Sequence, residues 1–523
     1  MLACSVAADD DEARAFAETF RRFLEWVHDD AGSTGSNEVV DLLQAHLGPG
    51  GRAASVLTRD LPVFDHVNLQ VALDAWSAEP GRTVTVHGVA RPPHFGPLDL
   101  SMLLHGTHVS QVRLAAPDLV DLPSGPDRTL ACLRLGLLLV TDARGAYGLL
   151  VRGPDPQYGQ GLVVEVAGLG TAPAQDVLRE LAELRHRLNV YRGQVLELTA
   201  TQTGVQVVFP RLPPTSREDV VLPEDVLRRV ERHSLGMAER RDDLRAAGQH
   251  LKRGLLLHGP PGTGKTHTTR YVVQHLTGST VLLLSGGALH MVGAVTALAR
   301  DLQPAALVLE DVDLVAEDRA FGPGSSPVLF ELLDAMDGAA EDADLLFLLT
   351  TNRADLLEPA LAARPGRVDV AVEIGLPDED ARRRLLLLYS SGVPLAWTDE
   401  ALASAVERTA GVTASFVKEL MRRAVLEALT ERPGRLERVT PAHLESALDD
   451  LLDSTQSVTR ALLGVPGDQS GPPAGLPLGR GGRGHDGHGG WFTASAAAHG
   501  VSFGGAYASE LDVGWDDEPP SPQ

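Results

Sequence analysis

The chain has 523 residues, enough for about three to four domains. Its hydrophobic fraction of 43% and charged fraction of 22% are those of an ordinary soluble globular protein. Acidic residues outnumber basic residues by 70 to 46, and the resulting net charge of −24 argues against a protein that coats nucleic acid or an anionic membrane.

Cysteine content and hydropathy favour a cytoplasmic protein. The two cysteines, Cys4 and Cys132, are too few for a disulfide framework, which is consistent with a reducing compartment. No apolar run approaches the roughly 18 residues that a membrane span needs. The segment Leu2-Ala3-Cys4 resembles the end of a lipoprotein signal, but the charged start and the apolar stretch that precede such an end are missing. We therefore expect a cytoplasmic protein without a membrane span.

The first region, residues 1–48, opens with acidic residues and then predicts a helix. The apolar residues that recur there at helical spacing are Phe16, Phe20, Phe23, Leu24 and Val27. A stripe of this kind either faces a core or docks a partner. A core-facing helix is the simpler interpretation.

Residues 49–205 predict an α+β accessory domain of unknown role. Apolar segments at 82–89, 129–140 and 161–169 are typical of strands, and the spacing at 174–192 predicts a helix. We find no chemical motif in this region. His105 and His108 could hold a metal ion only with further ligands, and no Cys or acidic residue lies at ligand spacing.

The remaining chain divides into an ordered and a disordered part. Between 217 and 453 strands and helices alternate, which predicts a parallel sheet with helices on both faces. From 464 to 523, 22 of 60 residues are Gly or Pro, so too little apolar surface remains for a core and a disordered tail is expected. The end of this tail, residues 508–518, either has no specific role or is a short docking motif.

The segment 254–276 carries the most specific motif of the chain. An apolar strand at 255–258 runs into Gly-Pro-Pro-Gly-Thr-Gly-Lys-Thr and then a helical pattern, which is the phosphate-loop motif in its expected context. Two glycines let backbone N–H groups turn toward phosphate oxygens, and the helix adds its positive N-terminal end. Lys265 is expected to reach the β- and γ-phosphates, and the Thr266 hydroxyl to coordinate Mg²⁺. The predicted ATP-binding residues are Gly259, Pro260, Pro261, Gly262, Thr263, Gly264, Lys265, Thr266 and His267.

Two later strands end in polar residues. The apolar strand at 305–309 is followed by Glu310 and Asp311, at the strand end where ligands bind in open α/β sheets. One carboxylate can join the Mg²⁺ shell while the other polarises the attacking water. The strand at 344–353 leads to Asn352, which is placed to orient a water or contact the γ-phosphate. The alternatives are an acid cluster that caps a helix and an ordinary turn.

Arg364 and Arg367 flank a Pro-Gly pair beyond this third strand. They are either solvated surface arginines or arginines presented to the nucleotide of a neighbouring subunit. In the second case their positive charge would stabilise the transferring phosphate.

Taken together, residues 217–453 resemble the AAA module of the AAA+ ATPases. The matching segments are 259–266 for Walker A, 307–311 for Walker B, 350–352 for sensor 1, 359–369 for the arginine-finger stretch, 375–388 for the start of the helical lid, 411–425 for the sensor 2 helix and 220–227 for the linker that contacts adenine.

The resemblance implies an α/β P-loop ATPase subdomain of five parallel strands at 217–376 and a small helical lid at 377–453. It implies rings, usually hexamers, with ATP and Mg²⁺ between subunits and a protein client as the target. Mg²⁺ would be held by Thr266 and Glu310, with Asp311 as the catalytic acid and Asn352 as sensor 1. Arg364 and Arg367 would then act in trans.

Two features depart from the family pattern. The usual Walker B order is Asp then Glu, whereas Glu310 precedes Asp311 here, as in the mitochondrial AAA proteins that assemble respiratory complexes. Where unfoldases carry an aromatic residue, this chain has Met291-Val292-Gly293, which puts threading of an unfolded chain in doubt. Two functions therefore remain: an ATP-driven remodeller or assembler of a protein partner, and a slow nucleotide-gated switch or scaffold.

Overall fold

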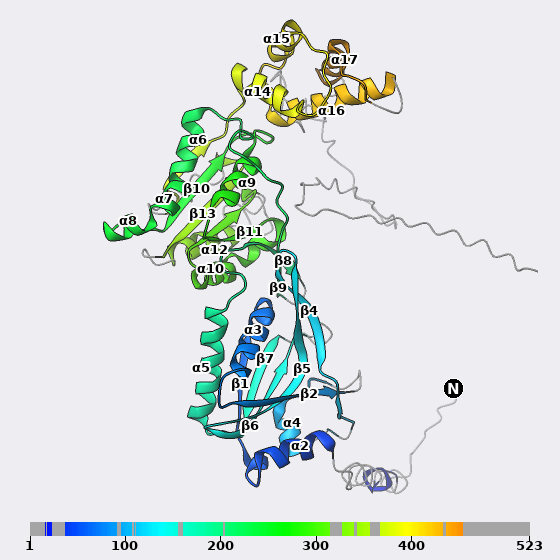
Figure 1. Ribbon diagram of the computed structural model, residues 1–523, viewed down its shortest axis with the longest axis vertical. Coiled ribbons are helices and arrows are strands. Elements are labelled where there is room, and N and C mark those ends of the chain that lie inside the picture. Colours follow the sequence, from blue (N-terminus) through cyan, green and yellow to red (C-terminus); the bar gives the residue numbers. More distant parts are fainter. Residues whose placement is uncertain are drawn as a thin grey trace, which may run out of the picture.

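The computed structural model describes residues 16, 18–22, 37–91, 96–106, 109, 111–154, 161–201, 204–313, 327–338, 343–355, 367–431 and 436–452 (Figure 1). Two seven-stranded sheets organise this part of the chain. No helix within these ranges has the length and apolar character needed to cross a membrane.

The first sheet is antiparallel, with the strand order β1-β7-β6-β5-β2-β3 and with β4 paired to β5. Its strands are β1 (Val56–Leu61), β2 (Thr83–Ala90), β3 (Arg113–Ala115), β4 (Asp118–Gly125), β5 (Arg128–Asp142), β6 (Gly145–Arg152) and β7 (Leu162–Ala167). The long strand β5 pairs with β4 through its first half and with β2 and β6 through its second half. Strands β2, β5 and β7 are those that the sequence predicts.

Helices cover both faces of this first sheet. Helices α3 (His66–Ser77) and α5 (Thr171–Arg187) pack on one face around the fully buried Trp76. Helices α2 (Glu38–Leu47) and α4 (Leu100–His105) pack on the other face. Successive side chains of β5 and β6 point to opposite faces of the sheet. Because helices cover both faces, the second half of β5 and most of β6 are buried.

The second sheet has the order β14-β10-β13-β12-β11-β8-β9. Its strands are β8 (Val195–Thr201), β9 (Gly204–Val208), β10 (Arg253–His258), β11 (Thr280–Leu284), β12 (Ala305–Leu309), β13 (Leu345–Thr351) and β14 (Val370–Glu373). All neighbouring pairs are parallel except β8 and β9. Every residue of β12 and β13 is buried, as expected for the middle of a sheet covered on both faces.

Helices cover this sheet on both faces, and a helical lid follows it. One face carries α6 (Glu224–Glu231), α7 (Met237–Glu239) and α9 (Lys265–His275), with α8 (Arg241–Ala246) after α7; the other carries α10 (Val292–Asp301) and α12 (Pro327–Asp337). The lid consists of α14 (Glu379–Tyr389), α15 (Asp399–Arg408), α16 (Ala414–Glu431) and α17 (Pro441–Leu452), which enclose a core of their own. This is the predicted AAA fold with its lid.

The segment between α5 and β8 ties the two sheets together. The Tyr191 hydroxyl donates to the Phe64 carbonyl (2.5 Å), and the Val190 N–H donates to the Asn68 side chain (2.9 Å), both in the first sheet's layer. On the other side, the Arg192 guanidinium donates to two backbone carbonyls near the start of β12, at 3.0 Å each. Residues of both regions share one buried cluster. The connection is therefore packed and hydrogen-bonded.

The sheet of the ATPase region has seven strands, whereas the family resemblance implies five. Strand β8 pairs with β11, although the predicted boundary at 205 assigns it to the accessory domain. The physical reason is that Leu196 and Leu198 alternate along β8 and point into the core shared by β11 and β12. The boundary at 205 therefore falls within the hairpin formed by β8 and β9.

The amino-terminal stripe is not core-facing where the structure describes it. Phe16 and Phe20 stack on each other with ring centroids 6.0 Å apart, yet they are 70% and 49% exposed. The expectation of a core-facing helix is wrong for these two residues. Phe23, Leu24, Val27 and the predicted tail 464–523 lie outside the described residues.

Assigning β8 to the ATPase core leads to a stability prediction. The Leu196 side chain is 0% exposed, and Leu196→Ala leaves a cavity between β8 and β11. We expect it to lower the free energy of unfolding of the ATPase region by about 2–5 kcal/mol. The measurement is amide hydrogen exchange of β11 and β12 in increasing urea.

Val208→Ala is the matched control, because Val208 lies on the neighbouring strand and is 38% exposed. It should change the same free energy by less than about 1 kcal/mol. Equal protection of β11 in the wild type and in Leu196→Ala would show that β8 does not contribute to the stability of this core.

Candidate functional site

The phosphate loop joins β10 to α9 and requires glycine at defined positions. Gly259 has a φ of 146°, and a Cβ there would lie 2.2 Å from the Ile374 carbonyl oxygen. Gly262 has a φ of 78°, and a Cβ there would lie 3.0 Å from Ser415 at the start of lid helix α16. The glycines thus allow close approach of β14 and of the lid, in addition to the curl of the loop.

Lys265 begins α9 and folds back over the loop. Its ammonium donates to the carbonyls of Gly259 and Pro260, at 2.8 Å each. Burial lowers the pKa of Lys265 to about 8, although the nearby charges of Asp311 and Asp313 act in the opposite direction. The ammonium is therefore held by neutral carbonyls that phosphate oxygens can replace.

Asp311 faces this lysine from the end of β12. Its φ of 52° lies in the left-handed region that is uncommon for residues other than glycine. The backbone N–H donates to the Thr350 hydroxyl (3.0 Å), and the Asn352 side-chain amide donates to the Asp311 carboxylate (3.3 Å). Burial, followed by the charge of Asp313, raises the pKa of Asp311. The structure thus brings together three of the predicted site residues: Lys265, Asp311 and Asn352.

A second acid, Asp313, fixes the end of β13, and the sequence argument gave it no role. Its carboxylate accepts from the Thr351 hydroxyl (2.9 Å) and from the Asn352 N–H (3.1 Å). It therefore holds the backbone that presents the Asn352 side chain. The sequence feature that could have indicated this role is the Asp-x-Asp spacing just beyond a buried strand.

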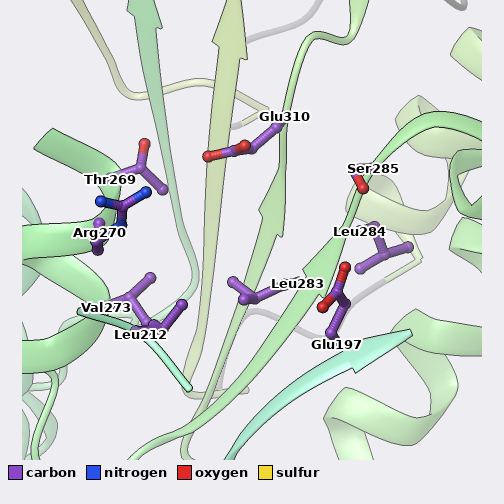
Figure 2. A pocket seen from close by; sticks show the side chains of 9 residues that line it. All are labelled: Glu197, Leu212, Thr269, Arg270, Val273, Leu283, Leu284, Ser285 and Glu310. Carbon is purple, nitrogen blue, oxygen red and sulfur yellow. The ribbon is translucent and has the colours of Figure 1, made fainter. Parts of the chain in front are cut away.

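Glu310 lines a separate pocket, whose lining residues do not include Lys265 or Thr266 (Figure 2). We call this the β8 pocket. It is lined by Glu310, by Thr269 and Arg270 of α9, by Glu197 of β8, by Leu283 of β11 and by neighbouring residues. Burial, followed by the charge of Asp311, raises the pKa of Glu310 to about 7. The two adjacent carboxylates therefore lie in different places: Glu310 lines the β8 pocket, and Asp311 contacts Asn352.

A further pocket lies between the linker before α6, the phosphate loop and the lid. Its walls include Val221, Leu222 and Pro223 of the linker, Thr263 of the loop and Ala414 of the lid. The chain around it is held by two contacts: the Ser415 N–H donates to the Gly262 carbonyl (3.0 Å), and the His267 ring contacts the Asp219 carbonyl (3.1 Å). A pocket next to a phosphate loop that combines apolar side chains with polar groups suits a purine base.

Arg367 does not have the exposed position expected for an arginine that acts on a neighbouring subunit. It is 6% exposed, and its guanidinium donates twice to the Asp337 carboxylate of α12, at 3.0 and 2.8 Å. This pair joins the start of the β14 segment to α12 within one chain, so Arg367 is held in the fold. Arg364 lies outside the described residues.

The segment expected to face a central pore is partly packed against the core. Residues 286–291 form a 3₁₀ turn before α10, and the half-buried Met291 packs against the cluster beneath the sheet. Val292 is fully buried, whereas His290 and Gly293 are exposed. Val292 is therefore not available to grip a chain, and Met291 is available only in part. In the accessory region His105 is exposed, His108 lies outside the described residues, and no group of three or more metal-binding side chains occurs among those described.

Comparison with known proteins agrees with this geometry. Residues 255–376 match the family described as "ATPase family associated with various cellular activities (AAA)". The ATP-dependent zinc metalloprotease FtsH of Thermus thermophilus is 34% identical over 218 residues, which cover 39% of this chain and 34% of that protein. The 26S proteasome regulatory subunit 8 of Caenorhabditis elegans is 34% identical over 201 residues, covering 36% of this chain and 48% of that protein.

The crystal structure of the FIGL-1 AAA domain aligns with a TM-score of 0.39 at 23% identity, covering 47% of this chain and 90% of that chain. The chain spans about a third of the length of the FtsH relative. Residues 255–376 are an AAA ATPase domain.

The lowered pKa of Lys265 predicts how ATP binding depends on pH. Phosphate oxygens need the protonated ammonium, which is lost in the free protein above a pH of about 8. Binding at higher pH must then take up a proton, so we expect the Kd for ATP to rise about tenfold between pH 7 and pH 9. Fluorescence titration with a labelled ATP analogue measures this.

Lys265→Arg is the control for this titration, because a guanidinium stays protonated throughout this range. Its binding is expected to be weaker but independent of pH. The same rise in Kd for both proteins would show that another group causes it.

The Arg367–Asp337 pair predicts that Arg367 contributes mainly to stability. We expect Arg367→Ala to lower the free energy of unfolding by about 1–2 kcal/mol, because two charge-assisted hydrogen bonds of a buried guanidinium are lost. Arg353→Ala is the control, since Arg353 forms an exposed pair with Asp355 worth less than about 1 kcal/mol. A variant Arg367→Ala that melts like the wild type but loses ATP turnover would instead support a role in trans.

Proposed function

We propose that this chain binds and hydrolyses ATP in a Mg²⁺-dependent reaction and uses the cycle to remodel or assemble a protein partner in the cytoplasm. The observation that carries this proposal is the set of Lys265, Asp311 and Asn352 at one sheet edge, with an amide-to-carboxylate hydrogen bond of 3.3 Å between the last two. The set lies in an AAA ATPase domain, and the FtsH and proteasome relatives support a protein as the target.

The residues at this edge suit the separate tasks of phosphate hydrolysis. Lys265 would neutralise the phosphates, and Asp311 would accept a proton from the attacking water that Asn352 orients. The pKa of Asp311 is raised by burial, which makes its carboxylate a stronger base than a solvated one. Asp313 would hold Asn352 in place through the backbone of β13.

The donor types of Thr266 and Glu310 would suit a Mg²⁺ ion. Thr266 lies in the first turn of α9, whereas Glu310 lines the β8 pocket with Thr269 and Arg270 of the next turn, so the Glu310 side chain would have to turn out of this pocket to share an ion with Thr266. A hydroxyl and a carboxylate are oxygen donors that Mg²⁺ prefers. Bound there with ATP, the ion would neutralise charge on the phosphate oxygens.

Ring formation is part of this proposal. The base pocket and the phosphate loop are completed by the lid within one chain, so nucleotide binding itself needs a single subunit. With Arg367 paired to Asp337, Arg364 is the arginine left to act on a neighbouring nucleotide, in a hexamer of the kind that the family resemblance implies.

A second candidate function is a slow nucleotide-gated assembly switch. It is favoured by the burial of Val292 and the partial burial of Met291, which leave little apolar surface to grip a chain at the pore position. The order of Glu310 and Asp311 also moves each carboxylate by one methylene, and a misplacement of about 1 Å can cost roughly 10²-fold in rate.

The experiment is ATP turnover per subunit as a function of protein concentration, for the wild type, Lys265→Ala and Arg364→Ala. We expect turnover to rise with concentration and to be lost in both variants. Mixing the two variants should restore part of it, because an intact Lys265 of one subunit then meets an intact Arg364 of the other.

Asp311→Asn separates the two candidate functions, since it should keep ATP binding while losing hydrolysis. Wild-type turnover no faster than that of Asp311→Asn, together with intact ATP binding, would favour the switch. Absence of ATP binding in the wild type would contradict both.

A further inference from the structure

The β8 pocket lies beside the phosphate loop and contains polar groups for which ATP hydrolysis gives no use. Its walls come from the phosphate-loop helix α9, from β11 and from β8, the strand added by the segment that leads from the accessory sheet (Figure 2). Of its polar groups, only Glu310 belongs to the proposed Mg²⁺ site. The others need a different explanation.

One of these groups is a buried hydroxyl without a partner. Thr269 is 2% exposed, and its Oγ1 makes no hydrogen bond with any described residue. The adjacent Thr268 shows the usual solution for a helical threonine, because its hydroxyl donates to the Gly264 carbonyl four residues earlier (3.0 Å). Burying a hydroxyl without a hydrogen bond costs free energy unless a bound group supplies the missing partner. Figure 2 draws Thr269 at the same end of the pocket as Glu310.

Two carboxylates share the pocket with this hydroxyl. Neither Glu197 nor Glu310 forms a side-chain hydrogen bond or an ion pair with the part of the chain that the structure describes. Burial raises the pKa of Glu197, which indicates that protein already displaces much of the water around it. Arg270 is the single cationic side chain among the lining residues and has an interaction of its own. The pocket therefore has two carboxyl groups and a hydroxyl that form no hydrogen bond with the described residues, beside one guanidinium.

Apart from Ser285, the remaining walls are apolar. They are formed by Leu212, Val273, Leu283 and Leu284, so the pocket combines polar side chains with a hydrocarbon surface. A bare metal ion suits neither this surface nor the guanidinium of Arg270, and these lining residues form no cluster of three metal-binding side chains. An organic cation on an aliphatic stem matches both halves, because its N–H groups can donate to carboxylates while its methylenes cover the leucines.

We propose that the β8 pocket binds an alkyl guanidinium or alkyl ammonium group, with Glu197 and Glu310 as its acceptors and Thr269 as an additional partner. The same chemistry is offered by a free polyamine and by an arginine or lysine side chain of a protein. An occupant would also engage Glu310 and so draw it from Mg²⁺. That consequence rests on the proposed function, whereas the binding itself does not.

The experiment is calorimetric titration of the full chain, without nucleotide or Mg²⁺, with agmatine, which carries a guanidinium and an ammonium on four methylenes. We expect saturable binding that weakens about tenfold or more in Glu197→Gln, since one charge-assisted hydrogen bond is lost. Thr269→Val, which keeps the shape of the side chain, should weaken it several-fold. Glu183→Gln is the control, because Glu183 is 70% exposed on α5, outside the pocket.

The result that would overturn the proposal is no saturable binding of agmatine, or equal affinities for Glu197→Gln, Thr269→Val and Glu183→Gln. A parallel titration with N-acetyl-argininamide distinguishes the sources: tighter binding than agmatine supports a protein side chain, and weaker binding supports a free polyamine. As a second measurement, agmatine should raise the Mg²⁺ concentration that gives half-maximal ATP turnover in the wild type. Failure of turnover alone would count against the proposed function and leave the calorimetric result to decide on the pocket.

Discussion

The parallel pairing of β10, β13 and β12 is the constraint on which the candidate site depends. In the register of these strands His258 lies beside Thr351, so β10 and β13 end at one level, and Leu309 lies beside Leu349, so β12 ends two residues earlier at the same edge. The residues that follow each end are then forced together, although they are far apart in the sequence. The strands can pair in this way because their residues are almost all apolar and both faces of the sheet are covered.

Much of this arrangement could be predicted from the sequence because its signals are local. The phosphate loop is a contiguous motif, and the buried strand before Glu310 ends at Leu309 as expected. The rule that parallel strands present their carboxyl ends at one edge accounts for the Asp311–Asn352 contact, although the sequence did not predict this hydrogen bond. The left-handed backbone at Asp311 and the position of Glu310 in the β8 pocket could not be predicted, because neither leaves a pattern in the sequence.

What the sequence did not reveal depends on contacts between distant segments. Nothing in the residues around 195 indicates whether β8 joins the first sheet or the second, since its alternating pattern fits either. The choice follows from the edge that β11 leaves open and from the hydrogen bonds of Tyr191 and Arg192. In the same way, the spacing after β13 does not distinguish Arg364 from Arg367, yet Arg367 is buried and its carboxylate partner, Asp337, lies 30 positions earlier in the chain.

The added strand also sets a limit on how this protein can be divided. Strand β11 is an inner strand only while β8 is present, and its outer backbone groups would otherwise face water beside the buried Leu282 and Leu284. An ATPase fragment that begins after β8 would expose an unpaired, apolar sheet edge. Such an edge is a common template for aggregation. Because β8 precedes the phosphate loop in the chain, a ribosome delivers this protecting strand before the edge that it covers. Any exchange of the accessory region with that of another protein must therefore keep residues 188–208 with the ATPase.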